Sequence, residues 1–266
     1  MSLPAIALDR TVLELKMYFR ERESVFFSFL FPVMMLSLFS AVFADSFESE
    51  GSPVSAARFF LPGMVAGGVM LTSFQTLAMS VAMEREDGTL KRLRSTPMPP
   101  AAYFLGKVGL VAATSLGQLA LLLLVARFAF GVPMPTAVSA WLTFAWVFLL
   151  GISTGTVLGI AYSSLAGSAK SAGAVVIGPL LVLQFISGVY FAYNDIPAWM
   201  QQVAALFPLK WVAQGMRSVF YPAQWQTQEV ANSWEHPMVA LVLALWLAAA
   251  LVLCARTFTW FKRGSV

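Results

Sequence analysis

Six long apolar stretches constrain what this chain of 266 residues can fold into. They cover residues 25–44, 59–83, 108–126, 138–161, 172–191 and 238–255, and none contains Asp, Glu, Lys or Arg. Because a helix rises about 1.5 Å per residue, about 20 residues cross the hydrocarbon core of a bilayer. The stretches are too long and alternate too little for barrel strands. We therefore expect an all-α integral membrane protein with six transmembrane helices in a domain over 25–266.

The basic residues predict the orientation. With six spans, the N-terminus, the second and fourth loops and the C-terminus share one side, which holds thirteen of the seventeen Lys and Arg residues. The other side holds Arg58, Arg127, Lys210 and Arg217. Cytoplasmic loops retain basic residues, so we expect a multi-pass protein of the inner (plasma) membrane with both termini cytoplasmic. The net charge of +4 follows from this topology and does not indicate a nucleic-acid partner.

Residues 1–24 form a separate element before the first span. Leu8, Val12, Leu15 and Phe19 recur at helical spacing, while most charged residues lie elsewhere around the helix. This pattern predicts an amphipathic interfacial helix along the inner membrane surface. Either membrane lipid or a cytoplasmic partner protein would contact it.

A charged loop over 84–100 joins the second and third spans. Gly88 is expected to end the preceding helix, and Thr89 to cap a new one. Leu90 and Leu93 share a face of that short helix, and Pro97 helps to end it. The loop thus predicts a cytoplasmic helix that offers two leucines and a basic rim to a protein groove. The alternative is an ordinary solvated loop.

Residues 197–221 are apolar but too short on either side of Pro208 to cross a membrane. We expect two re-entrant or interfacial helices on the outer side. Trp199, Trp211 and Tyr221 suit the interface, where a passive aromatic belt is the alternative role.

Some polar and small residues lie inside the spans. The polar residues include Gln75, Ser115, Gln118, Thr154 and Gln184. Each of them either lines a substrate path or makes a hydrogen bond between helices, and we favour the second role. Gly151, Gly155 and Gly159 predict a packing seam in the fourth span. A cavity lined by such residues favours an uncharged or amphiphilic molecule over a bare ion.

The chain lacks an evident energy source for transport. No titratable residue lies inside a predicted span, which disfavours ion coupling. The sequence has no G-x-x-x-x-G-K-[ST] loop to cradle a nucleotide phosphate. We therefore expect no cofactor in this chain, and ATP with Mg on a separate nucleotide-binding subunit. His236 is the chain's single histidine, so no metal site is expected.

Several motifs resemble those of one family. Residues 84–93 with Thr96-Pro97 and Gly106-Lys107 resemble the E-R-E-x-G-T-L-x-x-L…T-P…G-K signature of ABC-2 type permeases. A second block, in residues 187–191, 196–200, 207–209 and 215–217, resembles the S-G-x-x-F…P-x-W-L/M…P-L…R pattern, and residues 60–63 fit as well. Residues 193–196 depart from it, since the family often has Met before the Pro. The daunorubicin-resistance type of drug-efflux permease is most similar.

The resemblance implies a transport subunit without enzymatic activity, used as two permease copies with two ATPase subunits. Its expected cargo is a hydrophobic or amphiphilic small molecule, with a polysaccharide or lipid-linked glycan as the alternative. It assigns ATPase coupling to Glu84, Arg85, Glu86, Gly88, Thr89, Leu90, Leu93 and Pro97. It assigns an outer gate to Gly188, Pro197, Trp199, Pro208, Leu209 and Arg217.

An intramembrane serine protease is a more distant alternative. Residues 151–155 match G-x-S-x-G around Ser153, and His236 supplies an imidazole. The motif marks hydrolases at a strand-to-helix turn, whereas here it lies inside a predicted helix. Ser153 would lie roughly 22 Å along the axis from the level of His236, too far for proton transfer.

Overall fold

The computed structural model describes residues 2–49, 52, 54–165 and 169–260. These residues form helices and no strands, which confirms the predicted all-α class. In chain order the elements are α1 (Leu3–Arg20), α2 (Arg22–Val42), α3 (Ala44–Ser49), α4 (Ala56–Met70), the π-helical segment η1 (Leu71–Thr76), α5 (Leu77–Glu86), α6 (Thr89–Arg94), α7 (Pro100–Phe128), α8 (Val138–Tyr162), α9 (Ala169–Ile186), the 3-10 segment η2 (Tyr193–Asp195), α10 (Ala198–Ala205), α11 (Pro208–Phe220), the 3-10 segment η3 (Ala223–Gln228) and α12 (His236–Thr257).

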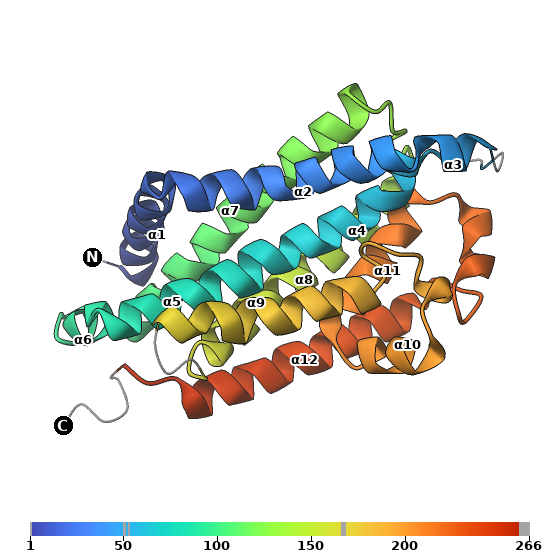
Figure 1. Ribbon diagram of the computed structural model, residues 1–266. Coiled ribbons are helices and arrows are strands. Elements are labelled where there is room, and N and C mark those ends of the chain that lie inside the picture. Colours follow the sequence, from blue (N-terminus) through green and yellow to red (C-terminus); the bar gives the residue numbers. More distant parts are fainter. Residues whose placement is uncertain (1, 50–51, 53, 166–168, 261–266) are drawn as a thin grey trace.

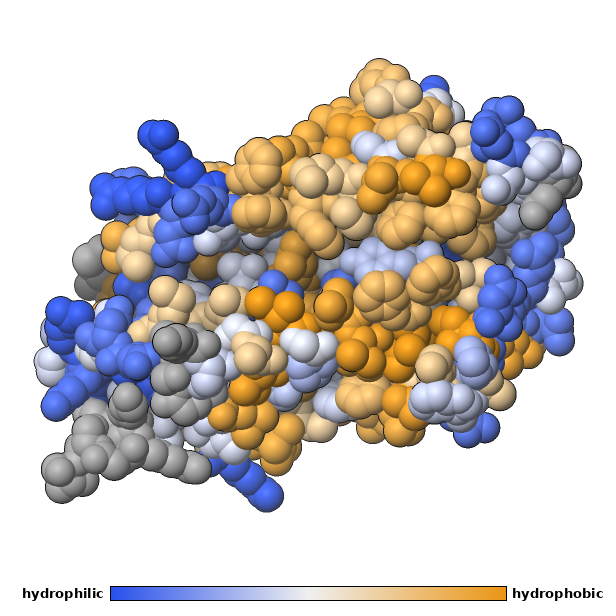
Figure 2. All heavy atoms as spheres, viewed as in Figure 1, coloured by the Kyte–Doolittle hydropathy of each residue, from blue (hydrophilic) through white to orange (hydrophobic). Residues whose placement is uncertain are grey.

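Five helices in the described part of the chain are long and apolar enough to cross a membrane: α2, the continuous helix Ala56–Glu86, α7, α8 and α12. They run along the length of the molecule, with α1 and α6 at one end and α3 and α10 at the other (Figure 1). Figure 2 shows hydrophobic residues over the middle of this face and hydrophilic residues gathered at both ends. This distribution fits a bundle that crosses a bilayer, since the hydrocarbon core excludes polar surface.

The prediction of a fifth span over residues 172–191 is wrong about where the helix ends. It corresponds to α9, which runs beside α4 and α5 but stops at Ile186 (Figure 1). Gly188 has a φ of 76°, a left-handed conformation that terminates a helix. The backbone of Val189 then packs so closely on Gly63 of α4 that a Cβ there would overlap it. The turn after α9 is thus held against the outer end of the second span.

The third predicted span begins too late. Helix α7 starts at Pro100, a residue that favours the first turn of a helix, rather than at residue 108. Lys107 therefore lies within a long membrane helix, and its side chain is fully buried. At least one of the membrane helices, α7, thus contains a charged residue near its N-terminus.

The glycine seam of α8 receives the π-helical segment η1. A Cβ at Gly155 would overlap the Ser73 hydroxyl, and one at Gly159 would lie 2.8 Å from the carbonyl oxygen of Phe74. The predicted packing seam is confirmed, and its partner is the second span. A π-helical turn inside an α-helix marks a local departure from regular geometry that is frequent at functional sites.

Helix α1 packs along α7 with its polar face inward. Ala7, Arg10, Glu14 and Tyr18 are buried, while Leu8, Val12 and Phe19 are exposed. Gly106 and Gly109 of α7 permit this approach, because a Cβ at either would overlap Arg10 or Thr11. The helix ends at Arg20 rather than at residue 24. Its apolar face remains free to meet the membrane interface.

Candidate functional site

Four charged side chains meet where α1, α5 and α7 come together. Glu14 Oε1 lies 2.5 Å from Arg10 Nη2, and Glu14 Oε2 lies 2.9 Å from Lys107 Nζ. Lys107 also pairs with Glu84. We call Arg10, Glu14, Glu84 and Lys107 the inner charge cluster. Tyr103 donates a hydrogen bond of 2.9 Å to Glu84 Oε2.

The inner charge cluster is electrically balanced, with two cations and two carboxylates. All four side chains are buried, so each charge depends on its partners for the solvation that water would supply. The pairs bind α1 and α5 to the same residue of α7. A displacement of the inner end of α5 must therefore move α1 and α7 or break a buried ion pair.

Helix α6 follows this junction directly. Gly88 has a φ of 78°, and the Thr89 backbone N–H donates to Asp87 Oδ1 at 2.8 Å. Asp87, and not Thr89 as expected, caps the short helix. Thr89 is its first helical residue.

The two leucines of α6 do not form an open docking face. Leu90 is fully buried in the bundle core, and Leu93 is half-buried against it. The prediction that they face a protein groove is wrong, because burying an apolar side chain against the spans gains roughly 1.5–3 kcal/mol. The exposed face of α6 is instead basic, with Lys91, Arg92 and Arg94.

The other predicted coupling residues lie around α6. Arg85 donates to the carbonyl oxygen of Ser163 at 2.7 Å and to that of Thr259 at 3.2 Å. It thereby joins α5 to the inner end of α8 and to the segment after α12. Glu86 and Pro97 are exposed. The described structure places all the predicted coupling residues at one end of the bundle.

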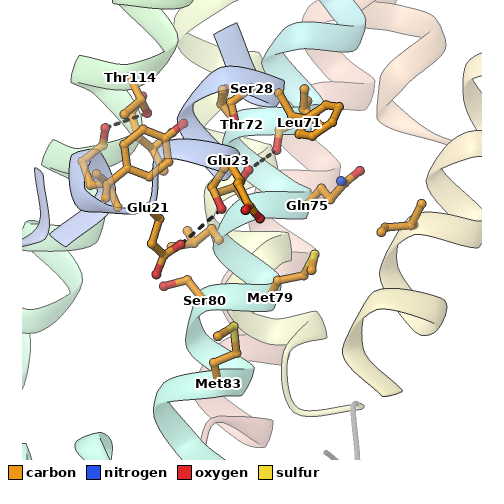
Figure 3. A pocket seen from close by; sticks show the side chains of 18 of the residues that line it. Glu21, Glu23, Ser28, Leu71, Thr72, Gln75, Met79, Ser80, Met83 and Thr114 are labelled. Atoms are coloured by element: carbon orange, nitrogen blue, oxygen red, sulfur yellow. Dashed lines mark hydrogen bonds between the residues drawn. The ribbon is translucent and has the colours of Figure 1, made fainter. Parts of the chain in front are cut away.

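A cavity of about 700 Å³ opens beside this junction. Residues of α1, α2, η1, α5, α7 and α9 line it. Gln75 of η1 points into the space, with Leu71 and Met79 nearby on the same helix (Figure 3). Gln184 of α9 lines it too, and its Oε1 accepts a hydrogen bond of 2.6 Å from Tyr190. Two of the five candidate substrate residues thus come together at one cavity.

The remaining three candidates make hydrogen bonds between helices and lie outside the cavity lining. Ser115 Oγ lies 2.7 Å from Thr72 Oγ1, and Gln118 Nε2 donates to the carbonyl oxygen of Ser28 at 2.7 Å. Thr154 Oγ1 donates to the carbonyl oxygen of Leu243 at 3.2 Å. These contacts support the packing role that the sequence favoured for them.

The predicted outer gate residues surround α11. Arg217 forms a buried bidentate pair with Glu229, with Nε–Oε1 at 2.6 Å and Nη2–Oε2 at 3.0 Å. Its Nη1 lies 3.5 Å from the carbonyl oxygen of Gly188. The other members have separate positions. Pro208 starts α11 and Pro197 precedes α10, whereas Leu209 lies in the core and Trp199 is exposed.

Lys210, also on α11, is a buried cation near this outer group. Its ammonium lies 3.5 Å from the ring centroid of Trp211 and 3.9 Å from Glu235 Oε2. Burial lowers the pKa of Lys210 to about 8, although Glu235 acts in the opposite direction.

The geometry does not form a serine protease site. Ser153 is exposed and donates to the carbonyl oxygen of Leu149 at 2.7 Å, while His236 Nε2 lies 2.9 Å from Ser218 Oγ. The imidazole therefore has a different serine as its partner. Among the described residues, no group of three or more His, Cys, Asp or Glu side chains is placed to hold a metal ion.

Sequence reasoning missed Arg10 and Glu14 as members of the inner charge cluster, and it placed Lys107 just outside the third span, in the Gly106-Lys107 motif. A signal was present in Gly106 and Gly109, which are three residues apart on α7 and flank Lys107. Small residues at that spacing permit a second helix to approach closely. The pairing of Lys107 with two different helices requires the tertiary structure.

Comparison with known proteins agrees with this architecture. The model of the ABC-2 type transporter family matches residues 9–221. "Putative transport permease ycf38" of Cyanophora paradoxa is 25% identical over 224 residues, which cover 83% of this chain and 74% of that protein. Its namesake in Porphyra purpurea is 24% identical over 223 residues, covering 81% of this chain and 75% of that protein. "Probable multidrug ABC transporter permease YbhR" of Escherichia coli (strain K12) is 27% identical over 154 residues, covering 57% of this chain and 40% of that protein.

Proposed function

The chain belongs to the ABC-2 type transporter family and is a membrane transport permease, and from this premise we propose that it exports a hydrophobic or amphiphilic small molecule using a separate ATPase subunit. The relative YbhR is named as a multidrug permease, which supports a cargo of this class. In this proposal ATP and Mg bind the partner, and this chain supplies the path through the inner (plasma) membrane. Both termini face the cytoplasm, where the partner lies.

The observation that carries the proposal is the connection between α6 and the cavity. Helix α6 presents Lys91, Arg92 and Arg94 at the end of the bundle where the basic residues gather. It follows α5 after the two-residue turn Asp87-Gly88, and Glu84 of α5 joins the inner charge cluster and also lines the cavity. A force applied to α6 by a partner is therefore carried to the walls of the cavity through buried ion pairs.

The proposal includes a second permease copy. The cavity lies between α2 and α9, and both helices carry exposed apolar residues there, such as Phe27 on α2 and Leu181 on α9. A second copy or membrane lipid must cover these side chains. A path enclosed by two copies would let Gln75 and Gln184 meet the cargo.

Co-purification tests the proposal. The full chain is isolated from its native membrane in mild detergent, and its associated proteins and ATP hydrolysis are measured. We expect a cytoplasmic ATPase in stoichiometric amount, and its loss in the Lys91→Glu/Arg92→Glu variant, because charge reversal removes the basic face of α6. Arg127→Glu, an exposed change at the opposite end of α7, should keep the ATPase. Recovery of no ATPase with the unchanged chain, even after crosslinking in membranes, would contradict the proposal.

A further inference from the structure

The charged residues that line the cavity beside the inner charge cluster are all acidic. Five carboxylate residues line it, from α1, α2 and α5 and from the residues next to their ends: Glu14, Glu21, Glu23, Glu84 and Asp87. Within the described part of the chain, no Lys, Arg or His is among the lining residues. This differs from the rest of the cytoplasmic end, where most of the 17 basic residues lie.

The carboxylates divide into two sets. Glu14 and Glu84 are neutralised by Arg10 and Lys107 in the inner charge cluster. Glu21, Glu23 and Asp87 are exposed and form no ion pair among the described residues. We call Glu21, Glu23 and Asp87 the acidic mouth. Their charge remains available to a ligand in the cavity.

The lining also contains apolar and adaptable side chains. Met79 and Met83 of α5, Leu71 of η1 and Phe27 and Phe31 of α2 all border the space. Methionine side chains adapt to ligands of different shape, and aromatic faces attract cations. Glu21 and Glu23 border the same space as Met79 and Ser80 (Figure 3). A molecule in the cavity therefore meets both negative charge and apolar surface.

A buried hydroxyl without a partner also lies at this cavity. Tyr18 lines it and is 8% exposed, yet its phenol oxygen has no hydrogen-bond partner. Ser28 is its polar neighbour, but the two hydroxyls do not meet hydrogen-bonding geometry. Burying a hydroxyl without a partner costs free energy, which a bound ligand with a polar hydrogen would recover.

We propose that the cavity binds amphiphiles with a cationic head, which contacts the acidic mouth while the apolar body lies against Met79, Met83 and Phe27. This deepens the proposed function by naming the charge of the cargo, and it rests on that function. A phospholipid headgroup fits poorly, because its phosphate would meet carboxylates and no basic lining residue in the described chain. The acidic mouth thus selects for a net positive charge.

Two ions of nearly equal size and opposite charge test the proposal. The full chain is placed in lipid nanodiscs, and binding of tetraphenylphosphonium and tetraphenylborate is measured against protein-free nanodiscs of the same lipid. We expect saturable binding of the cation only. Neutralising the mouth with Glu21→Gln/Glu23→Gln/Asp87→Asn should weaken cation binding about tenfold, since three modest charge interactions act together. Asn at 87 keeps the oxygen that caps α6.

The matched control neutralises two exposed carboxylates outside the cavity, Asp45→Asn/Glu48→Gln on α3, and should leave cation binding unchanged. Equal binding of the two ions, unchanged affinity in the mouth variant, or no saturable cation binding by the unchanged chain would each overturn the proposal. Co-purification of the ATPase is judged separately, so these results do not decide the proposed function.

Tyr18→Phe tests the unpartnered hydroxyl. Dodecylammonium carries N–H donors, whereas dodecyltrimethylammonium has none. We expect the variant to lose about threefold in affinity for the first probe and none for the second, because the Tyr18 oxygen accepts from N–H. An unchanged ratio of the two affinities would contradict the role of Tyr18 in the site.

Discussion

The ammonium group of Lys107 pairs with carboxylates from two other helices. Glu14 belongs to α1 and Glu84 to α5, and both pair with Lys107 on α7. Breaking a buried ion pair by removing one partner is costly, because the remaining charge keeps its desolvation penalty. The ionic contacts that join α1 to two spans thus meet at a single residue.

We expect Lys107→Met to destabilise the protein by about 3–5 kcal/mol, since it leaves Glu14 and Glu84 without their shared cation. Thermal unfolding of the detergent-solubilised chain measures this. Adding Glu84→Gln should restore much of the loss, and the exposed Lys16→Met should have little effect. Equal unfolding temperatures for Lys107→Met and Lys16→Met would contradict the role of the inner charge cluster.

Lys210 predicts a dependence of stability on pH. Its pKa in the folded protein is about 8, below the ordinary value of 10.5. Between these values the unfolded chain binds a proton that the folded chain lacks, so the free energy of unfolding rises as pH rises through this window. Unfolding temperatures compared at pH 8 and pH 10 should show a smaller rise, or none, in Lys210→Met. An identical rise in both proteins would show that another group is responsible.

At the scale of the elements, the second span is shaped by its contact with α8. The π-helical segment η1 brings Ser73 and Phe74 onto Gly155 and Gly159, and the same segment directs Gln75 into the cavity (Figure 3). Packing on one side of the helix and cavity lining on the other are therefore linked through η1.

Gly159→Ala tests this contact. The added Cβ would lie 2.8 Å from the carbonyl oxygen of Phe74, and backbone cannot move aside as a flexible side chain does. We expect a loss of about 1–3 kcal/mol from overpacking. Gly173→Ala on α9 is the matched control, because nothing lies within 4 Å of its added Cβ. A stability loss in the control equal to that of Gly159→Ala would indicate a general effect of glycine replacement.

The existence and type of most elements could be predicted from the sequence, since hydrophobic runs and prolines mark them locally. The predicted outer segment 197–221 corresponds to α10 and α11, and Pro208 begins the second of them. The orientation of amphipathic elements could not be predicted. Their patterns define two faces but not the neighbour that each face meets, so Leu90 was expected to face a protein groove and the buried contacts of Arg10 were missed. The cavity likewise depends on helices far apart in sequence.

Across the whole molecule, the basic helix α6, the inner charge cluster and the cavity are connected to one another through α5. Arg85 extends this connection to α8 and to the segment after α12. The family assignment covers residues 9–221, which include all three parts. The central claim is that a partner ATPase acts on the exposed face of α6.

Site-directed crosslinking in intact membranes tests that claim most directly. Cys254 is the chain's single cysteine, so Cys254→Ser with Arg92→Cys places one thiol on the exposed face of α6. A photoactivatable maleimide attached there should capture an ATPase subunit, identified by mass spectrometry. The same probe at Glu48→Cys, on α3 at the opposite end, should capture none. The account predicts an ATPase adduct at position 92 only; its absence there, or an equal yield at position 48, would contradict the account.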